Sequence, residues 1–112
     1  MQIERSDSGS VSVLAVSGRI DAYTAAELDR AVLGAVEAGR HLVVDLSGTD
    51  YVSSAGLRVL ITAAKRADQQ QLKLCLCGLQ EAVREVFDIA GFTRLFVIQD
   101  SREAALAALS AT

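Results

Sequence analysis

The stretch HLVVDLSGTDYVSSAGLRVL, residues 41–60, decides the fold class. It starts with an almost unbroken apolar run, residues 41–46, which suits a central strand covered on both faces. A polar connection follows at residues 47–53. Apolar side chains then recur at helical spacing: Leu57, Leu60, Ile61 and Ala64. We therefore expect a buried strand, a polar loop at its carboxyl end, and a helix that begins at Ser53 or Ser54.

Two strands and a helix are expected before this stretch. Residues 2–5 and 11–17 flank a turn-rich segment, which predicts a hairpin. Helical spacing follows in a set of apolar residues: Leu28, Ala31, Val32, Ala35 and Val36. Thr24 and Glu27 have the spacing of a capping box at the start of this helix, and Gly39 is placed to end it.

Strands and helices alternate in the rest of the chain. Residues 72–77 alternate as a strand, residues 83–90 have helical spacing up to Gly91, and a short strand at 95–98 precedes a final helix at 100–109. The order predicts an α/β fold with a central mixed sheet of roughly four to five strands and about four flanking helices. The opening hairpin would be antiparallel and the later strands parallel. The final helix is expected to dock on its own sheet rather than on a second copy.

Composition narrows the possible functions. The 112 residues are 51% hydrophobic and 22% charged, enough for one core, so residues 1–112 are expected to form a single domain. No apolar run is long enough for a membrane span and the start lacks a signal-peptide core, which favours a cytoplasmic protein without membrane contact. A net charge of -3 and only 4% aromatic residues argue against a nucleic-acid partner. The partner is therefore expected to be a protein.

The two cysteines, Cys75 and Cys77, give no sign of a special site. They stand two residues apart in a predicted strand, on one face but too closely spaced for an easy disulfide. With one histidine in the chain, a metal site lacks ligands. We expect buried strand residues, no metal and no cofactor.

The serine pair at the second helix start is the candidate site. At a helix N-terminus the first N–H groups lack acceptors and the macrodipole favours negative charge, so either a capping hydroxyl or a phosphate would be stabilised there. On position alone Ser54 is more simply a helix cap. Gly56 costs the helix roughly 1 kcal/mol relative to Ala, which indicates either close approach to the backbone or tight packing on the sheet.

An enzymatic role for Ser54 is not supported. The residues around it do not form G-x-S-x-G, and the only histidine, His41, stands at the far end of the preceding strand. The sequence has no phosphate-binding loop of the G-x-x-x-x-G-K-[ST] or G-x-G-x-x-G type. We therefore predict that the protein is not an enzyme, and that phosphorylation of Ser54 would need another protein.

Two segments carry a family resemblance. DLSGTDYVSSAGLRVL (residues 45–60) and GRIDAYTAAEL (residues 18–28) resemble the STAS domain of bacterial anti-sigma factor antagonists, and the resemblance extends over essentially the whole chain. It implies the STAS fold and a partner-switching cycle. In that cycle the unphosphorylated antagonist binds an anti-sigma factor that is also a serine kinase and supplies the ATP site. The sigma factor is released, phosphorylation of the antagonist ends the binding, and a phosphoserine phosphatase resets it.

The family's D-S-[ST]-G-L motif assigns the site residues. Aligned on the Gly-Leu pair, it implies phosphorylation of Ser54, and it leaves Ser53 as the alternative acceptor because Ser53 stands where the family has an acid. The partner-binding surface that the resemblance implies comprises Asp21, Ser53, Ser54, Ala55, Gly56 and Leu57. Asp21 and Asp45 also match the family pattern. Asp21 is either a cap residue that flanks the helix or a partner contact, and Asp45 is either a hydrogen-bond acceptor that stabilises the loop or a partner contact.

Two further questions stay open at this point. The protein could instead be a STAS scaffold or interaction subunit of a signalling assembly or a transporter, in which the serine only caps a helix. For the oligomeric state we expect a monomer or a weak dimer.

Overall fold

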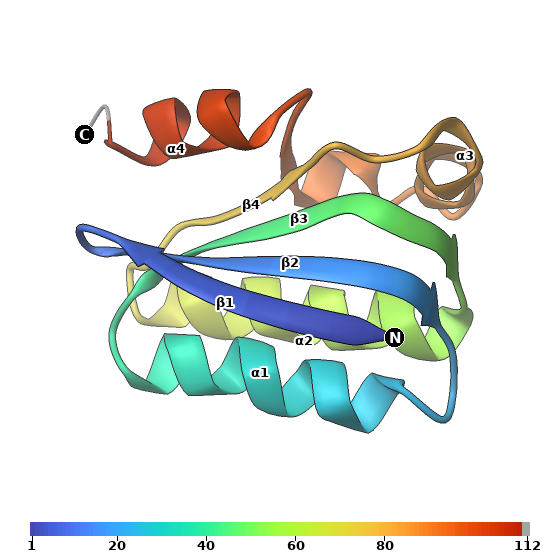
Figure 1. The fold of residues 1–112 in the computed structure, drawn as a ribbon, viewed down its shortest axis with the longest axis horizontal. Coiled ribbons are helices and arrows are strands. Elements are labelled where there is room, and N and C mark those ends of the chain that lie inside the picture. The colour runs from blue at the N-terminus through green and yellow to red at the C-terminus, as the bar shows by residue number, and fades with distance from the viewer. Residues whose placement is uncertain (111–112) are drawn as a thin grey trace.

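The computed structural model describes residues 1–110, which form a five-stranded sheet with helices on both faces (Figure 1). The strand order is β1-β2-β3-β4-β5, with β1 antiparallel to β2 and the other neighbours parallel. The strands are β1 (Gln2–Ser8), β2 (Val11–Ile20), β3 (His41–Val52), β4 (Leu74–Cys77) and β5 (Val97–Gln99). The helices are α1 (Ala25–Glu37), α2 (Ser54–Gln69), α3 (Glu81–Ile89) and α4 (Arg102–Ser110), with a 3-10 helix η1 (Thr93–Leu95). The predicted mixed α/β architecture and the central position of residues 41–46 are confirmed.

Two layers of helices bury the two faces of the sheet. In Figure 1, α1 and α2 lie below the sheet and α4 lies above it. The face toward α1 and α2 carries the larger cluster, which includes Leu14, Val16, Leu42, Val44, Leu76, Leu28, Leu60 and Phe87. The opposite face packs on α4 through Val11, Val13, Val43, Cys75, Cys77, Ala105 and Leu109. The last helix therefore docks on its own sheet, as expected.

The cysteines belong to the smaller cluster under α4. Cys75 and Cys77 are both buried and unpaired on neighbouring inward positions of β4. Burial raises the pKa of the Cys77 thiol to about 12, and the nearby Asp45 carboxylate adds to the shift. A thiol held protonated in this way packs as a small apolar side chain.

The segment at residues 47–52 is a strand, not the polar loop that its composition predicts. It continues β3 beside the end of β2, past two irregularities in the register, one between Ala15 and Ser17 and one between Gly18 and Arg19. Thr49 is buried, and its hydroxyl donates to the Val16 carbonyl at 2.8 Å. Since the neighbouring strand satisfies these polar groups, the segment stays extended despite its loop-like sequence.

The capping box predicted for α1 does not form. Thr24 does occupy the N-cap, but its side chain makes no capping hydrogen bond to the first turn of the helix. Its hydroxyl instead accepts from the Asp21 backbone N–H at 2.9 Å and lies 3.1 Å from the Arg19 carbonyl, to which it donates. The turn before the helix takes up this hydroxyl, and the backbone N–H of Glu27 bonds the Thr24 carbonyl at 3.1 Å. By contrast Gly39, at φ +73°, follows the end of α1 as predicted.

The fifth strand begins later than the predicted 95–98. Leu95 belongs to η1, and the buried Phe96 ring packs edge-on against Phe87, with 5.6 Å between ring centroids. Pairing with β4 therefore starts only at Val97.

Candidate functional site

The candidate site lies at the carboxyl ends of β2 and β3, where α2 begins. Ile20 pairs with Val52 in the sheet register, and the Ser53 backbone N–H donates to the Ile20 carbonyl at 2.8 Å. The turn that holds Asp21 follows β2 directly, and the serine pair follows β3 directly. The two segments therefore lie side by side.

The two adjacent serines have different roles. Ser53 has extended backbone angles and is the N-cap of α2, and its Oγ accepts from the Gly56 N–H at 3.3 Å. Ser54 is the first residue of the helix, its side chain is exposed, and its hydroxyl bonds none of the residues that the structure describes. The interpretation of Ser54 as the cap is therefore wrong, because Ser53 performs this role and leaves the Ser54 hydroxyl accessible.

The start of α2 is electrostatically suited to an anion. The helix is 16 residues long and has no acidic residue in its first turn. The N–H groups and the positive end of the macrodipole thus meet no carboxylate from the helix's own first turn. A phosphate on the Ser54 oxygen would lie at this positive end.

Gly56 is required by packing. A Cβ on Gly56 would lie 2.5 Å from Ile20 Cγ2 and 3.2 Å from Val52 Cγ1. This distance decides between the two explanations, in favour of tight packing on the sheet. Gly56 and Leu57 are buried and Ala55 is half-buried, so we expect Gly56 and Leu57 to shape the predicted partner surface from beneath rather than to contact a partner.

Asp21 organises the turn before α1. Its Oδ1 accepts from the backbone N–H groups of Tyr23 at 3.0 Å and Thr24 at 3.1 Å. Burial acts to raise the pKa of Asp21, but these hydrogen bonds and the Thr24 hydroxyl outweigh it, so the pKa lies below its ordinary value. These contacts, made just before the start of α1, support the interpretation of Asp21 as a cap residue that flanks the helix.

Asp45 anchors α4 to the sheet. Its Oδ1 accepts from the Ser47 N–H at 2.9 Å, and its Oδ2 accepts from two nitrogens of Arg102 at 2.9 and 3.1 Å. Burial would raise the pKa of Asp45, yet the bonds from Ser47 and Arg102 lower it below the ordinary value. Asp45 thus acts as a structural hydrogen-bond acceptor, in agreement with the first of its two interpretations.

Three residues beside the serine pair were not singled out from the sequence. Tyr23 is 94% exposed and Tyr51 is 41% exposed. The Arg19 guanidinium carbon lies 4.0 Å from the Tyr51 ring centroid, and the two residues are register partners at the ends of β2 and β3. Tyrosine and arginine are the types that most often dominate binding interfaces. The available signal was that both tyrosines of the chain lie within the two motif segments, Tyr23 in residues 18–28 and Tyr51 in residues 45–60.

Residues 1–110 offer neither a metal site nor a helix that could span a membrane. No group of His, Cys, Asp and Glu side chains there could hold a metal ion. None of the helices described has the length and apolar character needed to cross a membrane.

Known proteins share both the sequence and the fold. The model of the STAS domain family matches residues 2–105. An anti-sigma factor antagonist of Bordetella bronchiseptica, BtrV, is 43% identical over 97 residues, which are 86% of this chain and 84% of that protein. The anti-sigma-B factor antagonist of Listeria monocytogenes is 33% identical over 101 residues, covering 89% and 88% of the two chains. The crystal structure of an anti-sigma factor antagonist from Mycobacterium paratuberculosis superposes with a TM-score of 0.89 at 27% identity, over 97% of this chain and 93% of that one.

The agreement of sequence and fold decides the family. Anti-sigma factor antagonists are non-enzymatic regulators, which confirms the prediction that this protein is not an enzyme. The chain belongs to the STAS domain family and, within it, to the anti-sigma factor antagonists.

Proposed function

We propose that this protein is the antagonist of a partner-switching cycle, turned off by phosphorylation of Ser54. Unphosphorylated, it binds an anti-sigma factor in the cytoplasm and so releases a sigma factor. The anti-sigma factor is also the serine kinase and holds the ATP, and a phosphoserine phosphatase reverses the modification. The observation that carries the proposal is the exposed Ser54 hydroxyl at the start of α2, without a hydrogen-bond partner among residues 1–110.

Ser54 is a better acceptor than Ser53. The Ser53 Oγ already accepts from the Gly56 N–H, and the residue is only half-exposed. Transfer of a phosphoryl group to Ser53 would disturb the cap, whereas Ser54 can be modified with the cap in place. A kinase can therefore reach the Ser54 oxygen without opening the helix.

A phosphate on Ser54 would end binding by local charge rather than by refolding. It adds a charge of about -1.5 to -2 beside a surface that carries Tyr23 and the Arg19–Tyr51 pair. A partner pressed against this surface would have to desolvate the phosphate, and any acidic group opposite it would be repelled. The helix start meanwhile stabilises the phosphate, so the antagonist itself stays folded.

Phosphorylation assays with matched variants test the proposal. The protein is incubated with ATP and each serine-kinase anti-sigma factor of the same genome, and intact mass and tandem mass spectrometry follow the product. We expect one phosphoryl group on Ser54, none on Ser54→Ala, and continued phosphorylation of Ser53→Ala. Ser54→Ala should keep its affinity for the anti-sigma factor, and Ser54→Asp should lose about tenfold or more.

Two results would contradict this function. Phosphorylation of Ser54→Ala at the wild-type rate would move the acceptor elsewhere, with Ser53 the first residue to test. The absence of phosphorylation by every such kinase, together with equal affinity of Ser54→Asp for its partners, would favour a scaffold role without a phosphoswitch.

A further inference from the structure

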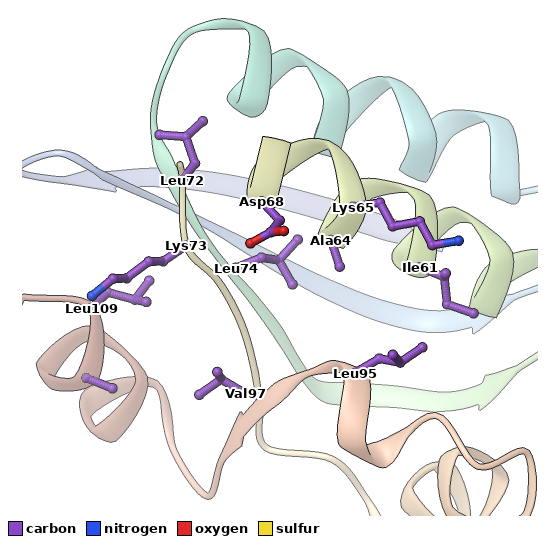
Figure 2. A pocket seen from close by; sticks show the side chains of 11 residues that line it. Ile61, Ala64, Lys65, Asp68, Leu72, Lys73, Leu74, Leu95, Val97 and Leu109 are labelled. Atoms are coloured by element: carbon purple, nitrogen blue, oxygen red, sulfur yellow. The ribbon is translucent and has the colours of Figure 1, made fainter. Parts of the chain in front are cut away.

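A hollow lies at the edge of the sheet that β5 forms. It has a volume of about 500 Å³ and lies between the second half of α2, the start of β4, η1 with β5, and the end of α4 (Figure 2). We call it the edge groove. Its volume is in the range of small-molecule sites in proteins.

The floor and walls of the edge groove are aliphatic. Ile61 and Ala64 come from α2, Leu72 and Leu74 from the approach to β4 and from β4 itself, and Leu95 and Val97 from the last crossover. Leu95 is 54% exposed and Val97 is 53% exposed. Apolar side chains of this size that line one hollow and face solvent mark a binding surface more often than isolated exposed residues do.

Two lysines give the edge groove its charge. Figure 2 shows Lys65 and Lys73 extending in opposite directions, with Asp68 between them. Within the part of the chain that the structure describes, neither ammonium group has a carboxylate within ion-pair distance. Lys73 is half-buried, whereas Lys65 is exposed and stands one helical turn from Asp68, whose charge offsets it. Among residues 1–110 the charged residues of the lining, Lys65, Asp68 and Lys73, therefore leave a net positive charge beside an aliphatic surface, and Lys73 is the less exposed of the two lysines.

We propose that the edge groove binds an aliphatic carboxylate of the fatty-acid class. The chain would lie along Leu74, Val97 and Leu95, and the carboxylate would pair with the Lys73 ammonium group. Aliphatic walls without an aromatic ring favour an alkyl chain, and the positive charge of Lys73 favours an anionic head group. This ligand site does not depend on the proposed phosphoswitch.

Titration with dodecanoate below its micellar concentration tests the site. Isothermal titration calorimetry at low salt, with amide chemical shifts to locate the ligand, should show saturable binding at the edge groove. Ala64→Trp fills the groove from α2 and should weaken binding by about tenfold or more, since losing the burial of two methylene groups suffices for that. Ala107→Trp, at an exposed position of α4, is the matched control and should bind as the wild type does.

The head group is tested in the same titration. Lys73→Gln should weaken dodecanoate binding by about tenfold, because a charge-assisted hydrogen bond is lost, and Lys65→Gln should change it little. Dodecanol should bind wild-type protein more weakly than dodecanoate. Thermal unfolding of every variant checks that each is folded before binding is compared.

Several results would overturn the proposal. These are no saturable binding of dodecanoate, equal affinity of Ala64→Trp, or equal affinity of dodecanol and dodecanoate. A concentration-dependent dimer that Ala64→Trp abolishes in sedimentation experiments, without dodecanoate binding, would assign the edge groove to a second copy of the chain.

Discussion

The first turns of α1 and α2 occupy equivalent places in the fold and have different chemistry. Each follows the end of a central strand, and each has a hydroxyl residue at the N-cap, Thr24 or Ser53. At α1 the Thr24 hydroxyl bonds within the turn of Asp21, and Glu27 adds a carboxylate to the first turn. At α2 Ser53 caps the helix, the first turn has no acid, and Ser54 is exposed. Only α2 therefore combines an accessible hydroxyl with an uncompensated helix end.

The largest difference between the two helices should come from their glycines. Gly56→Ala in α2 would place a methyl group 2.5 Å from Ile20 Cγ2, and Ile20 is fully buried. We expect it to lower the free energy of unfolding by about 2 kcal/mol, the usual cost of overpacking. Gly34→Ala in α1 meets no atom within 4 Å and should raise it by about 0.5 to 1 kcal/mol.

Urea denaturation of both glycine variants measures this contrast. If Gly56→Ala is as stable as the wild type, the contact with Ile20 is not what requires glycine, and close approach of a partner to the backbone becomes the better explanation. Gly34→Ala serves as the control for the general gain in helix propensity.

The second contrast is between the neighbouring serines. Ser53→Ala removes the acceptor for the Gly56 N–H and should cost about 1 kcal/mol of unfolding free energy, the typical value for an N-cap. Ser54→Ala removes a hydroxyl without a partner among residues 1–110 and should change stability by less than about 0.5 kcal/mol. Equal losses for the two variants, again in urea, would show that the cap is shared.

The dependence of stability on acidic pH should differ between variants of the turn at α1 and variants of the cap at α2. The pKa of Asp21 is lowered in the folded state, so its contribution to stability is present above its unfolded pKa of about 3.9 and is lost as the pH falls through the folded value. In Asp21→Asn the melting temperature should therefore fall less steeply on acidification. Ser53→Ala should keep the wild-type slope. If the melting temperature of Asp21→Asn falls with pH as steeply as that of the wild type, the Asp21 carboxylate does not stabilise the α1 turn.

The site shows how far sequence patterns reach. The apolar run at residues 41–46 predicts the central strand because its periodicity and β-branched content admit few alternatives. The polar composition of residues 47–53 predicts a loop, but residues 47–52 are a strand because β2, a partner distant in sequence, satisfies polar groups such as the Thr49 hydroxyl, which donates to the Val16 carbonyl. A tertiary hydrogen bond of this kind leaves no local signature.

The sequence also could not predict the first residue of α2 to within one position. Helical spacing placed the start of α2 at Ser53 or Ser54, but the cap depends on backbone angles, and the extended angles of Ser53 decide it. The sequence did not indicate the edge groove, for a different reason. Its walls come from separate elements, so it exists only after α2, β4, η1, β5 and α4 have packed together.

The smallest expected effect tests the electrostatic part of the comparison. Ser54→Asp puts a carboxylate at the first position of α2, where no acid is present, and should raise the free energy of unfolding by about 0.5 kcal/mol at low salt. Ala25→Asp makes the same change at the first position of α1, where Glu27 already supplies a charge, and should gain less. Both gains should fade near about 1 M salt, where screening shortens to a few ångströms. An equal or larger gain at Ala25 would mean that the two helix ends do not differ in their affinity for negative charge, and the preference for a phosphate on Ser54 would then have to come from the kinase alone.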